Sequence, residues 1–384
     1  MCLCVKKEIM LYFKKEVALL FVICSCVCNF VRILIIKIMV LNLSKSILIT
    51  GATGFVGSYL TRLLVKKGYT HVLCMKRATS PMDLVADVAE RVTWVEGDIR
   101  DVPFLEEILR GYGVQQIFHC AAVVSFDPRD REEMYDINAT GTANVVNAAL
   151  ECGVEKLVHV SSIAAIGRVE HEKTVAETNK WQRSDLNTHY AISKYQAEQE
   201  VWRGIAEGLS AAIVNPSVIL GSQFWEHGTG RLFEQVWTGL RFYTEGATGY
   251  VDVRDVVHFM EKLMTSDIDN QRFILNGENW TYKKMFEDIA HILNKKPATI
   301  PVTPFLRQVA WRVEWLKSLI TKKRPLITRE TARTSATTFF FKNDKSLAAF
   351  SDFKYTPIAV TIEETARQFL ESEKVGKRGA ALPI

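Results

Sequence analysis

Cysteine is scarce in most of this chain and shows no pairing pattern. Five of the 8 cysteines precede residue 29, and only Cys74, Cys120 and Cys152 lie in the rest of the 384 residues. These three sit in or beside apolar stretches, so we expect buried free thiols in a reducing compartment and not a disulfide framework. Clusters of His, Cys, Asp and Glu with metal-ligand spacing are also lacking, so no metal is expected.

Outside one short segment, positive and negative residues nearly balance, so a net charge is also lacking there. The formal net charge is +5, and residues 1–44 contribute six Lys or Arg against two Glu, so the remainder is nearly neutral. A neutral body argues against nucleic acid as a partner. With 48% hydrophobic and 24% charged residues, the composition is that of a globular protein with a substantial core.

Beyond residue 44, strand-like and helix-like segments alternate. This order predicts an α/β fold with parallel strands joined by crossover helices on both faces of the sheet. The predicted strands are 46–50, 71–75, 92–96, 116–120, 156–160 and 210–215, and the clearest helices are 56–67, 103–110, 130–151 and 189–207.

A glycine loop joins the first strand to the first helix. Gly51, Gly54 and Gly57 stand in ITGATGFVGSYL, with Thr53, Phe55 and Val56 between them. Glycine permits the tight turn and lets backbone approach a pyrophosphate, which the free N–H groups of the helix N-terminus then bind. The loop therefore predicts an NAD(P) site on a Rossmann-type, doubly wound parallel sheet.

The irregular second half predicts a separate lobe. Past about residue 220 the alternation gives way to aromatic and Gly-rich stretches and then to amphipathic helices. We expect a leader over 1–44, an NAD(P)-binding Rossmann domain over 45–220, and a smaller C-terminal substrate lobe over 221–375, with some segments returning to the Rossmann domain.

The leader is open to three interpretations. Its apolar run between Glu16 and Arg32 has only 15 residues, whereas a membrane helix needs about 20. It is a membrane anchor through residues 17–36, a signal peptide, or translation upstream of a start at Met39. We favour the last, because lysines before the run would hold the N-terminus in the cytoplasm and export a body that uses a cytoplasmic cofactor. The expected location is cytoplasmic.

Two cations at the end of the second predicted strand favour NADP(H) over NAD(H). NAD-specific sites place an acidic residue about 20 residues past the loop, whereas an Arg there accommodates the 2′-phosphate. Here Lys76 and Arg77 occupy that place, with no carboxylate before Asp83.

Tyr190 and Lys194 predict acid–base chemistry. Four residues apart on a helix, they project from one face, and a nearby ammonium would lower the pKa of the tyrosine. Ser161 and Ser162 follow the predicted strand 156–160 at the carboxyl edge, where ligands bind in such sheets. A serine there can hold a substrate oxygen while the tyrosine moves the proton.

Together these motifs resemble the extended short-chain dehydrogenase/reductases, which include sugar-nucleotide epimerases, dihydroflavonol reductases and 3β-hydroxysteroid dehydrogenases. The resemblance covers about residues 44–370 and rests on TGATGFVG, GDIRD, HCAA, INATGT, VSS, YAISK, NPSVILG and YVDVRDV.

The resemblance implies the remaining roles. Ser162, and not Ser161, would be catalytic with Tyr190, and Lys194 would also hold the nicotinamide ribose. Further cofactor contacts would be made by Asp98 and Ile99 at the adenine, Ala121 and Ala122 along the cofactor, and Pro216 and Val218 at the nicotinamide.

The expected substrate pocket is apolar and aromatic, which suits a small-molecule alcohol or ketone. Its predicted residues are Val124, Ser125, Phe126, Ile163, Phe224, Trp225 and Phe242. An NAD(P)-dependent oxidoreductase is thus favoured over two alternatives, an NDP-sugar epimerase or dehydratase and a non-catalytic NAD(P)H-binding sensor or assembly protein. A homodimer is compatible with this assignment, and a membrane partner follows only if the leader is an anchor.

Other polar residues are expected to be structural. Asn138 would tie a helix to a neighbouring strand. Asp252, Arg254 and Asp255 would form a buried ionic link between the lobes. His119 and His159, inside apolar strands, would be core histidines with satisfied hydrogen bonds.

Overall fold

The computed structural model describes residues 43–168, 172–322, 324–325, 327–376, 379 and 384. The chain divides into two units, Met1–Lys45 and Ser46–Ile384. Only residues 43–45 of the first unit are described, so the interpretations of the leader concern residues outside the described part. Within the described residues, no helix is long and apolar enough to cross a membrane.

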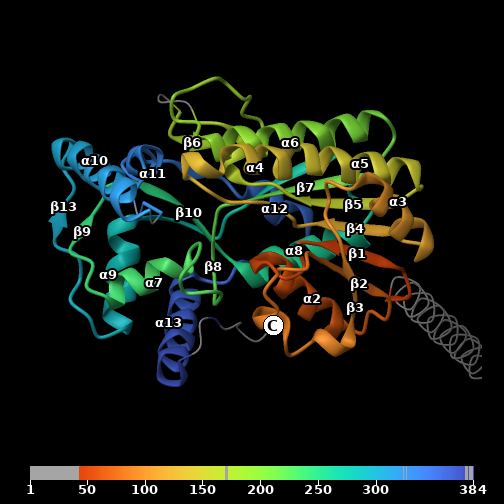
Figure 1. Cartoon of the computed structure of the whole chain (residues 1–384), viewed down its shortest axis with the longest axis horizontal. Helices are drawn as coiled ribbons and strands as arrows, with labels where there is room; N and C mark the ends of the chain where they lie inside the picture. Colours follow the sequence, from red (N-terminus) through yellow and green to blue (C-terminus); the bar gives the residue numbers. More distant parts are fainter. Residues whose placement is uncertain (1–42, 169–171, 323, 326, 377–378, 380–383) are drawn as a thin grey trace, which may run out of the picture. The chain divides into compact units, whose positions relative to one another are not determined.

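Seven parallel strands form the main sheet of the second unit (Figure 1), in the order β11-β7-β5-β4-β1-β2-β3. The six predicted strands are all present, and the seventh, β11, comes from the second half of the chain. Their bounds are β1 Ile47–Thr50, β2 Val72–Lys76, β3 Thr93–Glu96, β4 Gln116–His119, β5 Lys156–Val160, β7 Ala211–Pro216 and β11 Gln271–Leu275. This is the predicted Rossmann-type sheet, and its strand order reverses between β1 and β4, where such sheets bind ligands.

Helices cover both faces of this sheet. In Figure 1, α5 and α6 lie on one face and α2 and α8 on the other. A π-helical turn, Asp136–Thr140, interrupts the helix predicted over 130–151. The helices of this layer are α2 Phe55–Lys67, α3 Val102–Gly111, α4 Arg131–Tyr135, α5 Gly141–Glu151, α6 His189–Ala206 and α8 Val253–Thr265.

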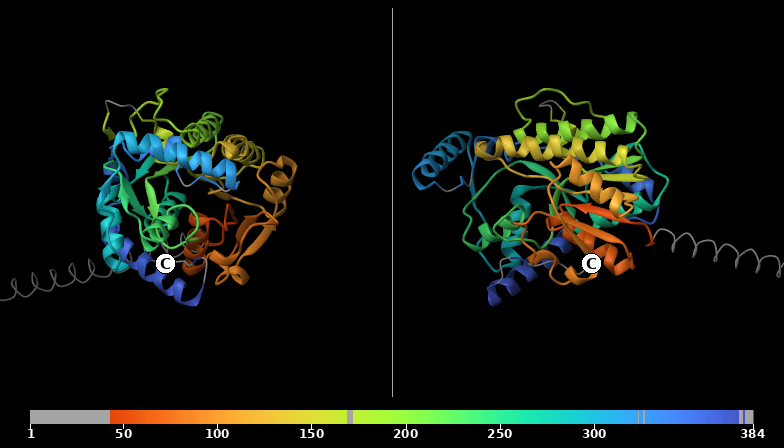
Figure 2. Two further views of the ribbon diagram at one scale, coloured as in Figure 1. Left: turned by 60° about the vertical axis from the view of Figure 1, so that its left-hand side comes forward. Right: turned by 45° about the vertical axis from the view of Figure 1, so that its right-hand side comes forward.

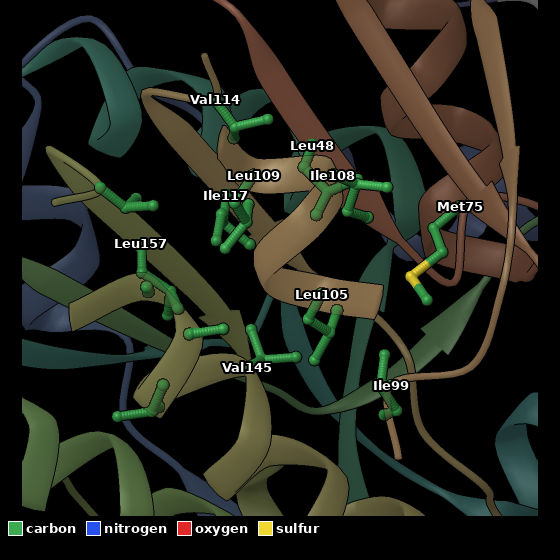
Figure 3. Packing of buried hydrophobic residues seen from close by; sticks show 14 of the residues in the cluster. Leu48, Met75, Ile99, Leu105, Ile108, Leu109, Val114, Ile117, Val145 and Leu157 are labelled. Carbon is green, nitrogen blue, oxygen red and sulfur yellow. The ribbon is translucent and has the colours of Figure 1, made fainter. Parts of the chain in front are cut away.

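The core beneath α3 and α5 shows why these segments are amphipathic. Leu48, Ile117 and Leu157 of three neighbouring strands pack against α3 and α5 (Figure 3), which contribute Leu105, Ile108, Leu109 and Val145. All are at most 6% exposed. Burial of each side chain of this size stabilises the folded state by about 1.5–3 kcal/mol. This packing stabilises the sheet that carries the site.

Beside the main sheet, a three-stranded sheet ordered β12-β10-β8 and two two-stranded sheets are formed mostly by segments from the second half of the chain. In the right-hand view of Figure 2, α10 lies at the periphery of this part. The strands are β6 Thr174–Val175, β8 Val218–Leu220, β9 Phe242–Tyr243, β10 Ala247–Asp252, β12 Glu278–Thr281, β13 Ile300–Pro301 and β14 Phe340–Phe341; the helices are α7 Gly230–Trp237, α9 Tyr282–Ile292, α10 Pro304–Thr321, α11 Arg329–Thr334, α12 Asp344–Ala349 and α13 Ile358–Val375.

A buried ionic link connects α8 with α13. The Asp252 carboxylate, fully buried, pairs with Arg254 at 2.6 Å and accepts a hydrogen bond from Thr361 Oγ1 at 2.8 Å. Arg254 also pairs with Glu364 at 2.6 Å. Asp255 differs from the expectation, because its carboxylate accepts hydrogen bonds from Thr356.

Candidate active site

The glycine loop forms a cradle that no larger residue could line. Gly51 has a φ of +67°, and a Cβ there would lie 2.7 Å from the backbone of Ala121. A Cβ on Gly57 would lie 2.2 Å from the Gly51 carbonyl oxygen. Gly54 precedes α2 and offers no side-chain cap to its N–H groups. The first turn of α2, which includes Phe55 and Val56, therefore presents free donors to an anion.

The carboxyl ends of β1, β2, β3 and β4 surround one cleft, and most of the predicted cofactor residues line it. Thr53 and the pairs Lys76 with Arg77, Asp98 with Ile99, and Ala121 with Ala122 join Gly51 and Gly54 there. The sequence analysis missed further lining residues, which are Met75, Ser80, Gly97, Val123 and Ile137. Residues near the catalytic end belong to other segments: Pro216 ends β7 and Val218 begins β8.

Charges at the end of this cleft formed by β2 and β3 are only partly paired. Lys76 Nζ lies 3.1 Å from a Glu96 carboxylate oxygen. The Arg77 side chain is 52% exposed, and its nearest carboxylate, that of Glu133, is 3.9 Å away. Asp98 pairs with Arg100 at 2.7 Å, and this hydrogen bond holds the Asp98 pKa below its usual value. Arg77 thus keeps most of its hydrogen-bonding capacity.

The three predicted catalytic residues meet where β5 ends beside α6. The Ser162 side chain lies close enough to the Tyr190 hydroxyl to lower its pKa. Lys194, 1% exposed, donates from Nζ to the Val160 carbonyl oxygen at 2.8 Å. The choice between the two serines is consistent with this geometry, because Ser161 Oγ turns away and donates to Glu198 at 2.7 Å.

Burial sets the protonation of this group. It raises the pKa of Tyr190, and the hydrogen bond with Ser162 offsets part of that rise. Lys194 is not among the causes, so the expected lowering by its ammonium is not seen. Burial also lowers the pKa of Lys194 to about 8, against the opposing effect of Glu198. At neutral pH the tyrosine is therefore a phenol and the lysine is charged.

Glu198, which was not predicted from the sequence, links α6 to the main sheet. Its carboxylate is 1% exposed and accepts hydrogen bonds from Ser161, from Asn215 at 2.7 Å and from Arg272 at 3.1 Å. Ser161 directly follows β5, Asn215 belongs to β7 and Arg272 to β11. Glu198 stands four residues after Lys194, so the two side chains lie on one face of the helix, and this spacing is the signal in the sequence that relates it to the site.

A second cleft lies near Tyr190. Two of the predicted substrate residues, Ser125 and Phe126, line this cleft, and the centre of the Phe126 ring is 5.8 Å from that of the Tyr190 ring. Contrary to the expected apolar pocket, the rest of the lining is largely polar, because α4, the segment before α6, the start of α6 and α11 contribute charged side chains. These include Arg131, Asp185, His189, Arg329, Glu330 and Arg333.

The other predicted substrate residues are placed elsewhere. Trp225 is 3% exposed, with its ring against Phe233 and Phe369, so core packing accounts for it. Ile163 is likewise buried in a hydrophobic cluster. The remaining three are Val124, which is 63% exposed, Phe224, which bridges to Gly379, and Phe242, which is 44% exposed on β9.

Asn138 has the expected structural role, although its partner is a loop and not a strand. Its side chain exchanges hydrogen bonds with the Val123 backbone at 2.7 and 2.9 Å and donates to Ser193 on α6 at 3.0 Å.

The two core histidines differ from each other. His119 is satisfied by the hydroxyls of Thr50 and Thr142. Neither ring nitrogen of His159 has a partner among the described residues, because its strand neighbours His119 and Ile213 offer no polar group to it. Burial lowers the pKa of both rings, so both are neutral.

Comparison with known proteins identifies the family of this chain. The model of the NAD dependent epimerase/dehydratase family matches residues 47–275. The chain belongs to this family. It is accordingly an enzyme of the extended short-chain dehydrogenase/reductase type.

Proteins similar to this chain include reductases. A putative dihydroflavonol 4-reductase of Synechocystis is 32% identical over 66% of this chain and 76% of its own length. Sterol demethylase protein B of Methylococcus capsulatus is 30% identical over 68% and 78%. Among solved structures, gox2253 is 31% identical with a TM-score of 0.72, over 85% of this chain and 98% of that one.

Proposed function

We propose that this enzyme interconverts a carbonyl compound and an alcohol, with Tyr190 as acid and base. The observation that carries the proposal is the placement of Ser162 close enough to Tyr190 to influence the tyrosine pKa, beside the buried ammonium of Lys194, which donates to the Val160 carbonyl oxygen at 2.8 Å. Similarity to a dihydroflavonol 4-reductase supports reduction. The substrate is a small molecule.

The cleft fits a nicotinamide dinucleotide. The glycine cradle leaves room only for backbone at Gly51 and Gly57, and the N-terminus of α2 has uncapped donors for a pyrophosphate. Asp98 and Ile99 would flank the adenine and Ala121 and Ala122 would line the cofactor backbone. Pro216, Val218 and Lys194 would hold the nicotinamide half. When bound, the dinucleotide supplies or accepts the hydride.

In the direction of reduction, the chain itself supplies the proton. Ser162 Oγ donates a hydrogen bond to the substrate oxygen, and the phenol of Tyr190 transfers its proton to that oxygen as it becomes an alcohol. The raised pKa keeps Tyr190 protonated at neutral pH, so the proton is available, but it also makes the phenol a weaker acid than a group whose pKa matches the operating pH.

Substitution of Tyr190 by Phe tests the proposal. The variant removes one hydroxyl and little volume, so turnover should fall by about 10²- to 10⁴-fold while the affinity for the reduced cofactor is unchanged. Tyr195→Phe is the matched control, because Tyr195 lies on the same helix with its ring stacked on Trp181 at 4.2 Å. If Tyr190→Phe keeps more than a tenth of wild-type turnover, the assigned role is wrong.

We further propose that NADP(H) is preferred over NAD(H). Arg77 lines the cofactor cleft and lacks a close carboxylate partner. A charge-assisted contact to phosphate contributes about 1.5–3 kcal/mol, so NADPH should bind at least about tenfold more tightly than NADH. Arg77→Ala should remove most of this difference in a fluorescence titration, whereas Arg110→Ala, at a similarly exposed but remote arginine, should not. Equal affinity of the wild-type enzyme for both cofactors contradicts the proposal.

Sugar-nucleotide epimerisation or dehydration is the second candidate, because the family includes both activities. Incubation of the enzyme with ketones, aldehydes and NDP-sugars separates the candidates. A reductase consumes reduced cofactor stoichiometrically, whereas an epimerase recycles it. A protein that binds cofactor and converts none of these compounds would be a sensor or assembly protein.

A further inference from the structure

Helix α10 has its apolar side turned away from the protein. Thr303 caps its N-terminus and Pro304 occupies the first turn, which favours a regular helix over these 18 residues. None of the 18, all of which the structure describes, is buried. The helix lies at the periphery in the right-hand view of Figure 2. Its exposed aliphatic and phenylalanine side chains are Phe305, Val309, Val313, Leu316, Leu319 and Ile320.

The spacing of these side chains places them on one stripe. Apart from Leu319, they follow one another at intervals of three or four residues, which share one face of a helix. Phe305 at the start of the stripe is 79% exposed, and Ile320 at its end is 75% exposed. A helix of a soluble protein normally buries such a stripe against the core. Contiguous exposed apolar side chains mark a surface that binds a partner or a membrane.

The opposite side of α10 faces the protein and is more polar. It carries Arg307, Trp311, Glu314 and Ser318, which are half-buried. The Glu314 side chain is 17% exposed, whereas that of Lys317, which pairs with it at 3.1 Å, is 57% exposed. The carboxylate therefore turns inward and the ammonium outward, so the outer surface of the helix is positive as well as apolar.

Basic side chains border the stripe on both edges. At about 100° per residue, Arg312 lies at one edge of the stripe and Lys317 at the other, and both are exposed. Long basic side chains in such positions lay their methylene stems along an apolar surface and hold the charge in a polar layer above it. Trp315, 55% exposed, adds an aromatic ring of the kind that favours the boundary between lipid and water.

We propose that α10 docks this enzyme on an anionic lipid surface. The helix would lie in the plane of the headgroups, with Phe305 and Ile320 among the inserted side chains and with Arg312 and Lys317 at the phosphates. The inference goes beyond the proposed function and does not depend on it.

Charge complementarity selects lipid over the other occupants. From Pro304 to Lys322 the sequence has four basic residues and one acidic residue, so a second copy of α10 would be repelled. Residues 1–44, with six Lys or Arg against two Glu, would be repelled as well. Nucleic acid has the required charge, but it would leave the apolar stripe in water. An anionic bilayer satisfies both the charge and the stripe.

Co-sedimentation of the full chain with lipid vesicles tests the proposal. The wild-type protein should bind vesicles of phosphatidylcholine and phosphatidylserine in equal amounts at least about tenfold more tightly than vesicles of phosphatidylcholine alone. The double variant Phe305→Ser with Ile320→Ser should bind the anionic vesicles at least about tenfold more weakly than wild type, because it removes inserted apolar area. Val360→Ser, at an exposed apolar residue of α13, is the matched control and should bind as wild type does.

A second pair of substitutions isolates the contribution of charge. Arg312→Gln with Lys317→Gln should weaken binding to the anionic vesicles by about tenfold or more and leave binding to the neutral vesicles unchanged. Lys283→Gln with Arg367→Gln removes two exposed charges from α9 and α13 and is the control. Cofactor affinity, measured by fluorescence titration, should be the same in every variant, which checks that each is folded.

Three results would overturn the proposal. The first is equal binding of the wild-type protein to both kinds of vesicle, or binding to neither. The second is vesicle binding by both α10 variants that equals that of wild type; because all variants retain residues 1–42, the binding would then belong to another part of the chain. The third is a wild-type dimer in sedimentation velocity that Phe305→Ser with Ile320→Ser dissociates, since a second copy would then cover the stripe.

Discussion

Replacement of Glu198 by Gln should destabilise the protein and disturb the site at the same time. The substitution keeps the shape of the side chain, so hydrogen bonds from Ser161 and Asn215 can partly persist. It removes the charge that faces Arg272, whose side chain is 19% exposed. Breaking a buried ion pair by removing one partner costs about 3–5 kcal/mol. We expect about 3 kcal/mol, because Arg272 keeps its hydrogen bonds to the carbonyl oxygens of Glu177 and Asn179.

Urea unfolding at equilibrium measures this loss as a change in the free energy of unfolding. Glu200→Gln is the matched control, because its pair with Arg203 is exposed and should contribute less than about 1 kcal/mol. Removal of both charges, in Glu198→Gln with Arg272→Gln, should recover part of the loss. A loss below about 1 kcal/mol in Glu198→Gln would refute the assigned importance of this carboxylate.

Three further predictions concern the site itself. Ser162→Ala should lower turnover by about tenfold or more, whereas Ser161→Ala should mainly reduce the unfolding midpoint in urea; the reverse pattern would exchange their roles. Because the pKa of Lys194 is lowered to about 8, its charge is present below that pH and is lost above it. The rate of reduction should therefore fall as the pH rises through 8, and in Glu198→Gln the fall should begin at lower pH; a rate independent of pH between 7 and 9 would contradict a role for the ammonium. Gly57→Ala should abolish cofactor binding in a fluorescence titration, because its Cβ would lie 2.2 Å from the Gly51 oxygen.

The sheet could be predicted from the sequence because local patterns determine it. Buried parallel strands are continuous apolar runs, and the glycine loop marks the first crossover. For the same reason the residues at strand ends, such as Asp98 and Ala121, were found to line one cleft. The strand β11 follows a long irregular stretch, and its pairing with β7 depends on contacts distant in sequence.

The substrate side was predicted less well, because aromatic residues serve both cores and pockets. Trp225 fills the core of the second lobe, where its partner Phe369 lies on a helix far along the chain. Glu198 stands in the printed sequence as an ordinary charged residue. What distinguishes it is the set of partners that face it in the folded protein, Ser161, Asn215 and Arg272, and no local pattern reports that.

The π-helical turn over Asp136–Thr140 has a consequence for how this segment can change in evolution. It holds one residue more than an α-helical turn would, and Asn138 within it reaches both Val123 and Ser193. Deletion of one residue here would restore a regular helix and rotate Asn138 by roughly 100° relative to the helix that follows. The segment should therefore accept substitutions on its outer face but resist any change in length, and variation in length among related chains should fall in the loops on either side.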